Sequence, residues 1–169
     1  MLARSRRTDT LRTVMANPIY AFFNTRAGLG PLCLRLALVA TFGYHGSQKA
    51  FGLFNGLGFQ ASLAVMTGSD GLGLPTALAT VAILAELIVA ILLFLGLFTR
   101  LAALLVILLM TGALIFVHAG SSFGDMELPF VVLAAGISLL FTGGGTLSTD
   151  KRISGALLPE VGYRSLRLT

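Results

Sequence analysis

The residues best suited to chemistry are five polar side chains that border or interrupt apolar stretches: His45, Lys49, Glu86, His118 and Glu127. His45 and Lys49 are four residues apart, so they share a face if one helix carries both. His118 and Glu127 end and begin neighbouring apolar stretches, which places them at the same level. The cluster is expected near the non-cytoplasmic side of the membrane. Glu86 lies deeper and would form the floor of a pocket. Imidazole and ammonium groups donate hydrogen bonds and a carboxylate accepts a proton, so this set suits a small polar headgroup such as a quinone ring.

Two ion pairs are predicted in addition to this cluster. A charge at the centre of a bilayer costs at least ~2.5 kcal/mol, so a charged residue in a span needs a partner. Arg35 lies about two helical turns into the first apolar stretch, and its long side chain would reach Glu86 near the middle of the second. If Arg35 points elsewhere, Glu86 is free to take a proton. An Arg100–Asp150 pair would tie two cytoplasmic ends of the spans together. Ser148 and Asp150 would cap a helix or lie against the cytoplasmic turn near Arg100.

Other interpretations of the same residues stay open. The polar side chains could pair only among themselves and fix helix packing, with no ligand. His45 and His118 could hold a metal or haem, although the sequence contains no CxxCH motif. Glu86 at mid-depth could serve proton or solute transport, although no span is interrupted in the manner of a transporter.

The elements that position these residues are predicted to be membrane-spanning helices. Only 11% of the 169 residues are charged and 56% are hydrophobic, more apolar surface than a soluble domain of this size can bury. Four stretches approach the ~20 residues needed to cross a bilayer, at 29–45, 75–98, 101–117 and 126–141. The long connection over 46–74 is too apolar for a solvated loop and predicts a short, partly inserted element. The fold class is therefore all-α, an integral membrane four-helix bundle with short interfacial segments.

The basic residues predict the orientation. Most of them flank the spans at the two ends of the chain, and Arg100 lies in the turn between the second and third spans. The positive-inside rule therefore puts both termini in the cytoplasm. This distribution is not that of a nucleic-acid-binding face, so nucleic acid is excluded as a partner. Three parts are predicted: residues 1–28 as a cytoplasmic or interfacial segment, 29–145 as the four-helix domain, and 146–169 as a cytoplasmic tail.

Short motifs in a particular order resemble the DoxX family, in the group that includes DoxD, MauE and the surfeit-locus membrane proteins. The matching residues are Arg35, His45-Gly46, Lys49-Ala50-Phe51-Gly52, Glu86, Gly96-Leu97-Phe98-Thr99-Arg100, His118, Glu127, Thr142-Gly143-Gly144-Gly145 and Leu147-Ser148-Thr149-Asp150. The resemblance covers residues 35–150, about two-thirds of the chain. The exit from the last span departs from the family pattern, because Gly144 and Thr146 stand where a proline and a basic residue are usual.

The resemblance implies a multi-pass protein of the bacterial inner membrane. Some members are subunits of a thiosulfate:quinone oxidoreductase and others accompany redox systems. The expected function is thus a membrane subunit of a quinone-linked redox system, surrounded by lipids and bound to a protein partner that supplies electrons. The chain has no cofactor motif of its own, so a quinone is the expected ligand. Whether the chain is itself an enzyme stays open, and the rival expectation is an anchoring subunit or a transporter.

Overall fold

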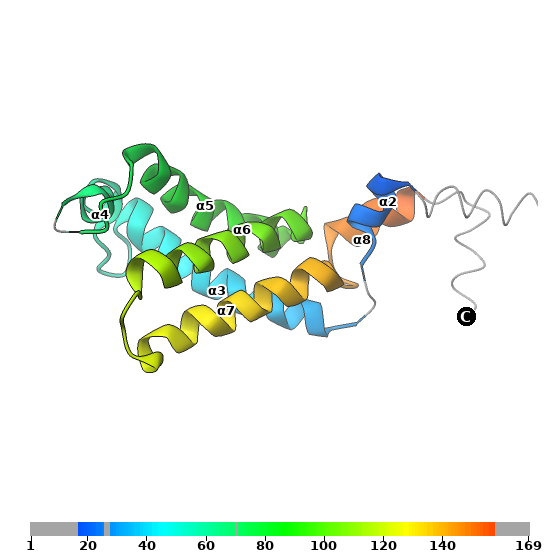
Figure 1. Cartoon of the computed structure of the whole chain (residues 1–169). Helices are drawn as coiled ribbons and strands as arrows, with labels where there is room; N and C mark the ends of the chain where they lie inside the picture. The colour runs from blue at the N-terminus through cyan, green and yellow to red at the C-terminus, as the bar shows by residue number, and fades with distance from the viewer. Residues whose placement is uncertain (1–16, 26–27, 70, 158–169) are drawn as a thin grey trace, which may run out of the picture.

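The computed structural model describes residues 17–25, 28–69 and 71–157, and these ranges are helical without any strand (Figure 1). Four long helices make up the body of the molecule, and three short helices flank it. The long ones are α3 (Gly30–Phe51), α5 (Thr76–Leu95), α6 (Thr99–Gly112), which continues as the π-helical turn η1 (Ala113–Val117), and α7 (Phe123–Thr142). The short ones are α2 (Pro18–Phe23), α4 (Gly58–Thr67) and α8 (Thr149–Ala156).

Each long helix packs against the next long helix along the chain, and together they enclose a common core. The main contacts are between α3 and α5 and between α6 and α7, with α5 against α6 joining the two pairs. Helix α4 packs on α3 and α5 at one end of the molecule, whereas α2 and α8 touch each other at the opposite end (Figure 1). The core contains Leu38, Phe42, Val89, Leu93 and Val106, each at most 2% exposed.

Three of the four predicted spans have the length and hydropathy to cross a membrane. Within the described ranges these are Thr76–Leu95, Thr99–Val117 and Phe123–Thr142. Helix α3 is 22 residues long but is not among them; its apolar residues are interrupted by Arg35 and His45 and followed by Gln48 and Lys49. The predicted first span ended at residue 45, but α3 continues to Phe51. His45 and Lys49 therefore do lie on one helix.

The long connection after α3 contains the short helix that its composition predicted. Gly52 ends α3 in the left-handed conformation, at φ +70°, and the chain then turns into α4. Most residues of α4 are apolar, and α4 packs against α3 and α5 at the end of the molecule where the connection links these two helices. The predicted boundaries at residues 28 and 145 both fall in connections between helices.

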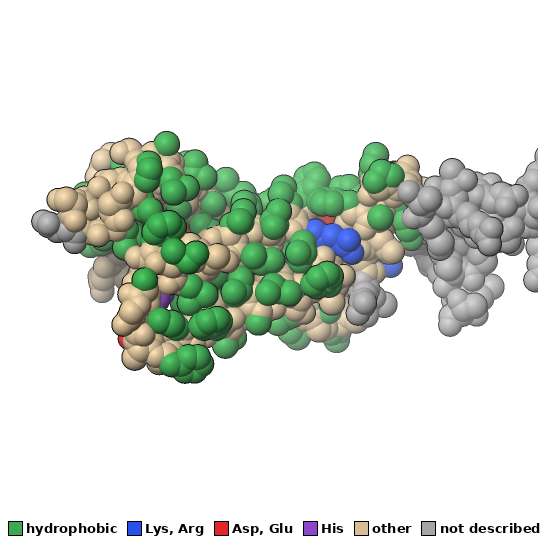
Figure 2. Space-filling model, viewed as in Figure 1, with side chains coloured by type: hydrophobic (Ala, Val, Ile, Leu, Met, Phe, Trp, Pro, Cys, Tyr) green, Lys and Arg blue, Asp and Glu red, His purple; other side chains and the backbone are tan. Residues whose placement is uncertain are grey.

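Apolar side chains cover most of the helical body on the face shown in Figure 2. Over the described helices as a whole, exposed apolar residues include Leu84, Ile88 and Ile91 of α5 and Leu104 and Leu108 of α6. A soluble protein rarely exposes so large a continuous apolar surface. Lipid contact along the long helices follows from this surface.

Candidate polar site between α3 and α5

The polar site centres on an ion pair between Lys49 of α3 and Glu86 of α5. Lys49 Nζ donates a hydrogen bond to Glu86 Oε1. The two helices approach closely here because Gly46 has no side chain: a β-carbon at Gly46 would lie 3.2 Å from the backbone nitrogen of Leu87 and 3.3 Å from Glu86 Cβ. The small residue thus brings the Glu86 carboxylate within reach of the Lys49 amine, one turn further along α3.

Glu86 is buried, and only one of its two carboxylate oxygens has a hydrogen-bond partner among the described residues. Its side chain is 10% exposed, whereas that of Lys49 is 38% exposed. Oε1 binds Lys49, but the buried Oε2 has no hydrogen-bond partner within the described part of the chain. An unpaired buried carboxylate oxygen is costly, so a group that donates a hydrogen bond to it would bind favourably. Glu86 can therefore accept a hydrogen bond or a proton from a ligand while Lys49 neutralises its charge.

The other predicted site residues lie more openly around this pair. His45 and Glu127 are exposed and His118 is half-buried. Neither imidazole nor the Glu127 carboxylate forms a hydrogen bond or ion pair with another described residue through its side chain. The His45 ring meets Tyr44 edge-on, with 5.3 Å between ring centres. Only Lys49 and Glu86 of the five predicted residues are thus brought into direct contact, and a common pocket for all five stays a prediction.

His118 follows a distorted turn of helix. Residues Ala113–Val117 form π-helical turns, and the His118 N–H donates to the carbonyl of Ala113 over 3.0 Å. Such π-helical insertions are rare and occur frequently at functional sites. Nothing in the sequence signals this turn. Among the described residues, no group of three or more His, Cys, Asp or Glu side chains comes together that could hold a metal.

The predicted Arg35–Glu86 pair is not formed. Arg35 is 3% exposed and points toward the other end of α5, where it donates to four backbone carbonyls. The bonds are Nε to Leu93 (2.8 Å), Nη2 to Phe94 (3.0 Å), and Nη1 to Gly144 (2.9 Å) and Leu147 (2.8 Å). Carbonyls at a helix C-terminus carry a partial negative charge and lack partners within the helix, so they stabilise the guanidinium in place of a carboxylate.

The predicted Arg100–Asp150 pair is also not formed. Asp150 lies against the turn between α5 and α6 as expected, but it accepts hydrogen bonds from the backbone N–H groups of Phe98 and Thr99, both at 2.8 Å. It thereby caps the N-terminus of α6, where the helix dipole favours an anion. Arg100 turns away and donates to the carbonyl of Asn24 over 3.1 Å. The predicted Ser148 cap is confirmed, since Ser148 Oγ accepts from the N–H of Lys151.

These bonds join four of the sequence motifs into one network at the α2–α8 end: Arg35, Gly96–Arg100, Thr142–Gly145 and Leu147–Asp150. Thr149 Oγ1 donates to the carbonyl of Leu95 over 2.8 Å, and the Asp150 N–H donates to the carbonyl of Gly96 over 3.0 Å. The last carbonyls of α5 are thus satisfied by Arg35, Thr149 and Asp150. Most polar groups of this network bond to one another, so the motifs at this end stabilise the fold, although Thr99 Oγ1 and Arg100 Nε have no partner among the described residues. At the other site, Glu86 keeps an open oxygen.

Comparison with known proteins found a matching family and a sequence relative. The DoxX family model matches residues 30–119. A protein of Bacillus subtilis (strain 168) named "Putative oxidoreductase CatD" is 33% identical over 123 residues, which are 72% of this chain and 85% of that protein. No solved structure was found to match the chain.

Proposed function

Since this chain belongs to the DoxX family of membrane proteins, we propose that it is a membrane subunit of a quinone-linked redox system, with the quinone ring bound beside Lys49 and Glu86. The observation that carries the proposal is the buried Glu86 carboxylate, paired through one oxygen and open at the other. The name of the Bacillus relative supports a redox role.

The chemistry of the pair suits both forms of a quinone. The ammonium of Lys49 donates to a quinone carbonyl, and Glu86 Oε2 accepts a hydrogen bond from a quinol hydroxyl. Lys49 is partly exposed and Glu86 is buried, so the ring would enter from the Lys49 side. His45, His118 and Glu127 belong to the wider predicted site and would contact the ring edge or its substituents. Electrons would be exchanged with a protein partner, because the proposed role of this chain is to bind and orient the ring.

The proposal includes a membrane arrangement. Helix α3, the first span in chain order, crosses the bilayer in addition to α5, α6 and α7, and it packs against α5 and α7. The membrane is a bacterial inner membrane, and both termini lie on its cytoplasmic side. The basic residues at the chain ends and at Arg100 support this orientation. Arg35 of α3 is buried against α5, and Glu86 of α5 is buried against α3. This burial supports the crossing by α3, since each polar group is shielded from lipid.

Binding of a short-chain quinone to the purified protein in detergent tests the function. Wild type should bind the quinone, and both Glu86→Gln and Lys49→Gln should weaken binding at least tenfold, since each removes a charge-assisted hydrogen bond worth about 1.5–3 kcal/mol. Asp125→Asn is the matched control, because Asp125 is an exposed acid that bonds to Ser122 and lies outside the pair. Equal binding by wild type and all variants would refute the quinone site.

The rival function is an anchoring subunit without a ligand. The direct Lys49–Glu86 bond favours it, since two charges that neutralise each other can simply lock α3 to α5. In that case, replacing both residues by apolar ones of similar size preserves activity of the complex, whereas a single replacement destabilises the subunit. Loss of activity in a stable double variant supports the ligand site instead.

A further inference from the structure

At the end of the molecule away from Lys49 and Glu86, basic side chains outnumber acidic ones. Among the described residues this end carries Arg35, Arg100, Lys151 and Arg152 but only one acid, Asp150. Both oxygens of Asp150 are bound to backbone N–H groups, and its charge is balanced by the buried Arg35 nearby. No described acidic side chain pairs with Arg100, Lys151 or Arg152. Three positive charges are therefore left to attract an anion.

The Arg100 side chain is held in place by a hydrogen bond, but not all of its N–H groups are bonded. Its Nη2 donates to the carbonyl of Asn24, which fixes the guanidinium between the end of α2 and the start of α6. Its buried Nε has no partner within the described ranges. Guanidinium groups bind phosphates through several N–H groups at once, so an orientated and partly free Arg100 is suited to that ligand.

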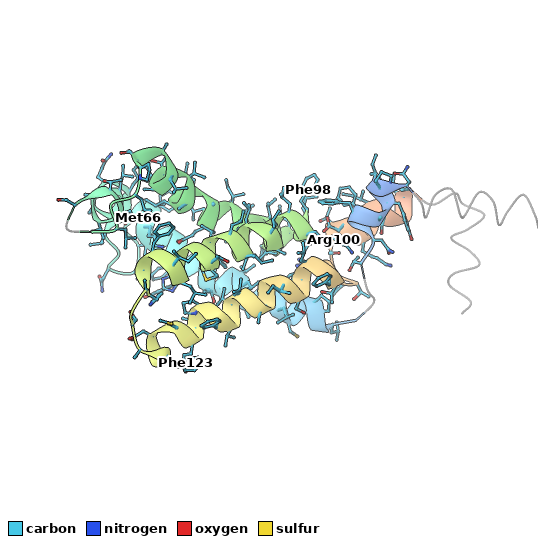
Figure 3. All side chains as sticks on the ribbon, in the orientation of Figure 1. Met66, Phe98, Arg100 and Phe123 are labelled. Atoms are coloured by element: carbon cyan, nitrogen blue, oxygen red, sulfur yellow. The ribbon has the colours of Figure 1, made fainter. Side chains whose placement is uncertain are left out.

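An aromatic cluster lies beside Arg100. The rings of Phe22, Phe23 and Phe98 lie with their centres 5.2–6.3 Å apart, and Phe22 and Phe98 remain 37% and 39% exposed. Figure 3 shows Phe98 and Arg100 at the end of α6 that faces α2 and α8, and in Figure 2 the visible Lys and Arg side chains gather there. Apolar rings next to unpaired cations are typical of a surface at the membrane interface.

The position along the span fixes the depth of this surface. Thr99–Val117 is an apolar stretch of 19 residues, about 28 Å long as a helix, which matches the hydrocarbon thickness. Arg100 is the second residue of that stretch and therefore lies at the headgroup boundary. Lys151 and Arg152, exposed on α8, lie on the element that packs against α2 at the same end.

We propose that α2, the start of α6 and α8 form a binding site for an anionic phospholipid, with Arg100 on its phosphate, Lys151 and Arg152 attracting its negative headgroup, and Phe22 and Phe98 against its acyl chains. The charge complementarity selects an anionic lipid over a zwitterionic one. The site is distinct from the Lys49–Glu86 pair at the other end of α3.

Native mass spectrometry of the detergent-purified chain tests this site with phosphatidylglycerol and phosphatidylcholine of identical acyl chains. Wild type should prefer phosphatidylglycerol. Arg100→Gln and the double variant Lys151→Gln/Arg152→Gln should lose this preference by about fivefold for each charge removed, whereas Arg100→Lys should keep most of it. Lys49→Gln removes the same charge at the opposite end and should leave the lipid preference unchanged.

Two results would overturn the proposal. One is an unchanged preference for phosphatidylglycerol in the double variant, whose side chains are exposed on α8 and whose removal leaves the core intact. The other is protection against thermal unfolding by inorganic phosphate alone that equals the protection by phosphatidylglycerol, since a free anion would then explain the site. An acidic protein segment as the true occupant would show as equal binding of both lipids by wild type.

Discussion

The guanidinium of Arg35 occupies the space that a β-carbon on Gly96 would need. Such a carbon would lie 2.5 Å from Arg35 Nη2 and 2.7 Å from Arg35 Cζ. Gly96 also has a φ of +63°, so it ends α5 in a conformation that L side chains rarely adopt. The glycine at the turn and the arginine in α3 are therefore a matched pair, although 61 positions separate them in the sequence.

Gly96→Ala should destabilise the protein by more than the roughly 1–2 kcal/mol of a left-handed alanine, because the new methyl group also displaces the Arg35 side chain from its carbonyls. Unfolding by SDS in mixed micelles measures the change in free energy. Gly112→Ala is the matched control, since a β-carbon there meets no atom within 4 Å and the backbone is helical. A loss at Gly96 no larger than the change at Gly112 would show that Arg35 does not need this space.

Double-mutant cycles should separate the two buried polar systems of α3. Lys49→Met and Glu86→Gln should show a coupling energy of about 1 kcal/mol, modest because Lys49 is 38% exposed. Arg35→Met and Glu86→Gln should be additive within about 0.5 kcal/mol, because the two residues share no bond. Free energies of unfolding of the single and double variants give both values. Strong coupling between Arg35 and Glu86 would contradict this separation and support the Arg35–Glu86 ion pair predicted from the sequence.

Asp150→Asn should destabilise the protein by about 1–2 kcal/mol, since it removes a charged cap from the N-terminus of α6 and the negative charge beside Arg35. An asparagine amide would also turn an N–H group toward the N–H of Phe98 or Thr99. Asp125→Asn changes an exposed acid in the first turn of α7 and should have a smaller effect on thermal unfolding. Similar melting temperatures for the two variants would contradict the capping role.

The proposed crossing of the bilayer by α3 predicts a labelling pattern in intact cells. In a Cys33→Ser background, single cysteines are placed at the exposed positions Ala21, Ser69 and Ala156. A membrane-impermeant maleimide should label Ser69→Cys, and should label Ala21→Cys and Ala156→Cys only after permeabilisation. If α3 did not cross, Ala21→Cys would label like Ser69→Cys, because only three crossings would separate Ala21 from Ala156.

The sequence predicted the apolar helices well because their length and hydropathy are set by the bilayer. The spans at 101–117 and 126–141 differ from the helices by only a few residues, and the short helix in the long connection was also expected. The first span was predicted to end before α3 does, because Gly46, Ser47 and Gln48 are polar or small residues typical of a loop. Packing against α4 and α5 keeps this stretch of α3 helical.

The partners of the charged residues were harder to predict. Depth along a helix placed Arg35 within reach of Glu86, but its long side chain can extend toward either end of a span. The backbone carbonyls that it binds leave no residue-type signal in the sequence. Asp150 was placed correctly near the α5–α6 turn, yet its true partners are again backbone groups. The Gly96 turn was the one indirect sign, since a glycine cap marks exposed carbonyls at a helix end.

Infrared difference spectroscopy of the protein with and without reduced quinone tests the open oxygen of Glu86 most directly. Adding quinol to wild type should shift a carboxylate stretching band, because the hydroxyl binds Oε2, and the shift should be absent in Glu86→Gln but retained in Asp125→Asn. An identical difference spectrum in Glu86→Gln, or no carboxylate shift in wild type at saturating quinol, would contradict a quinone site at the Lys49–Glu86 pair.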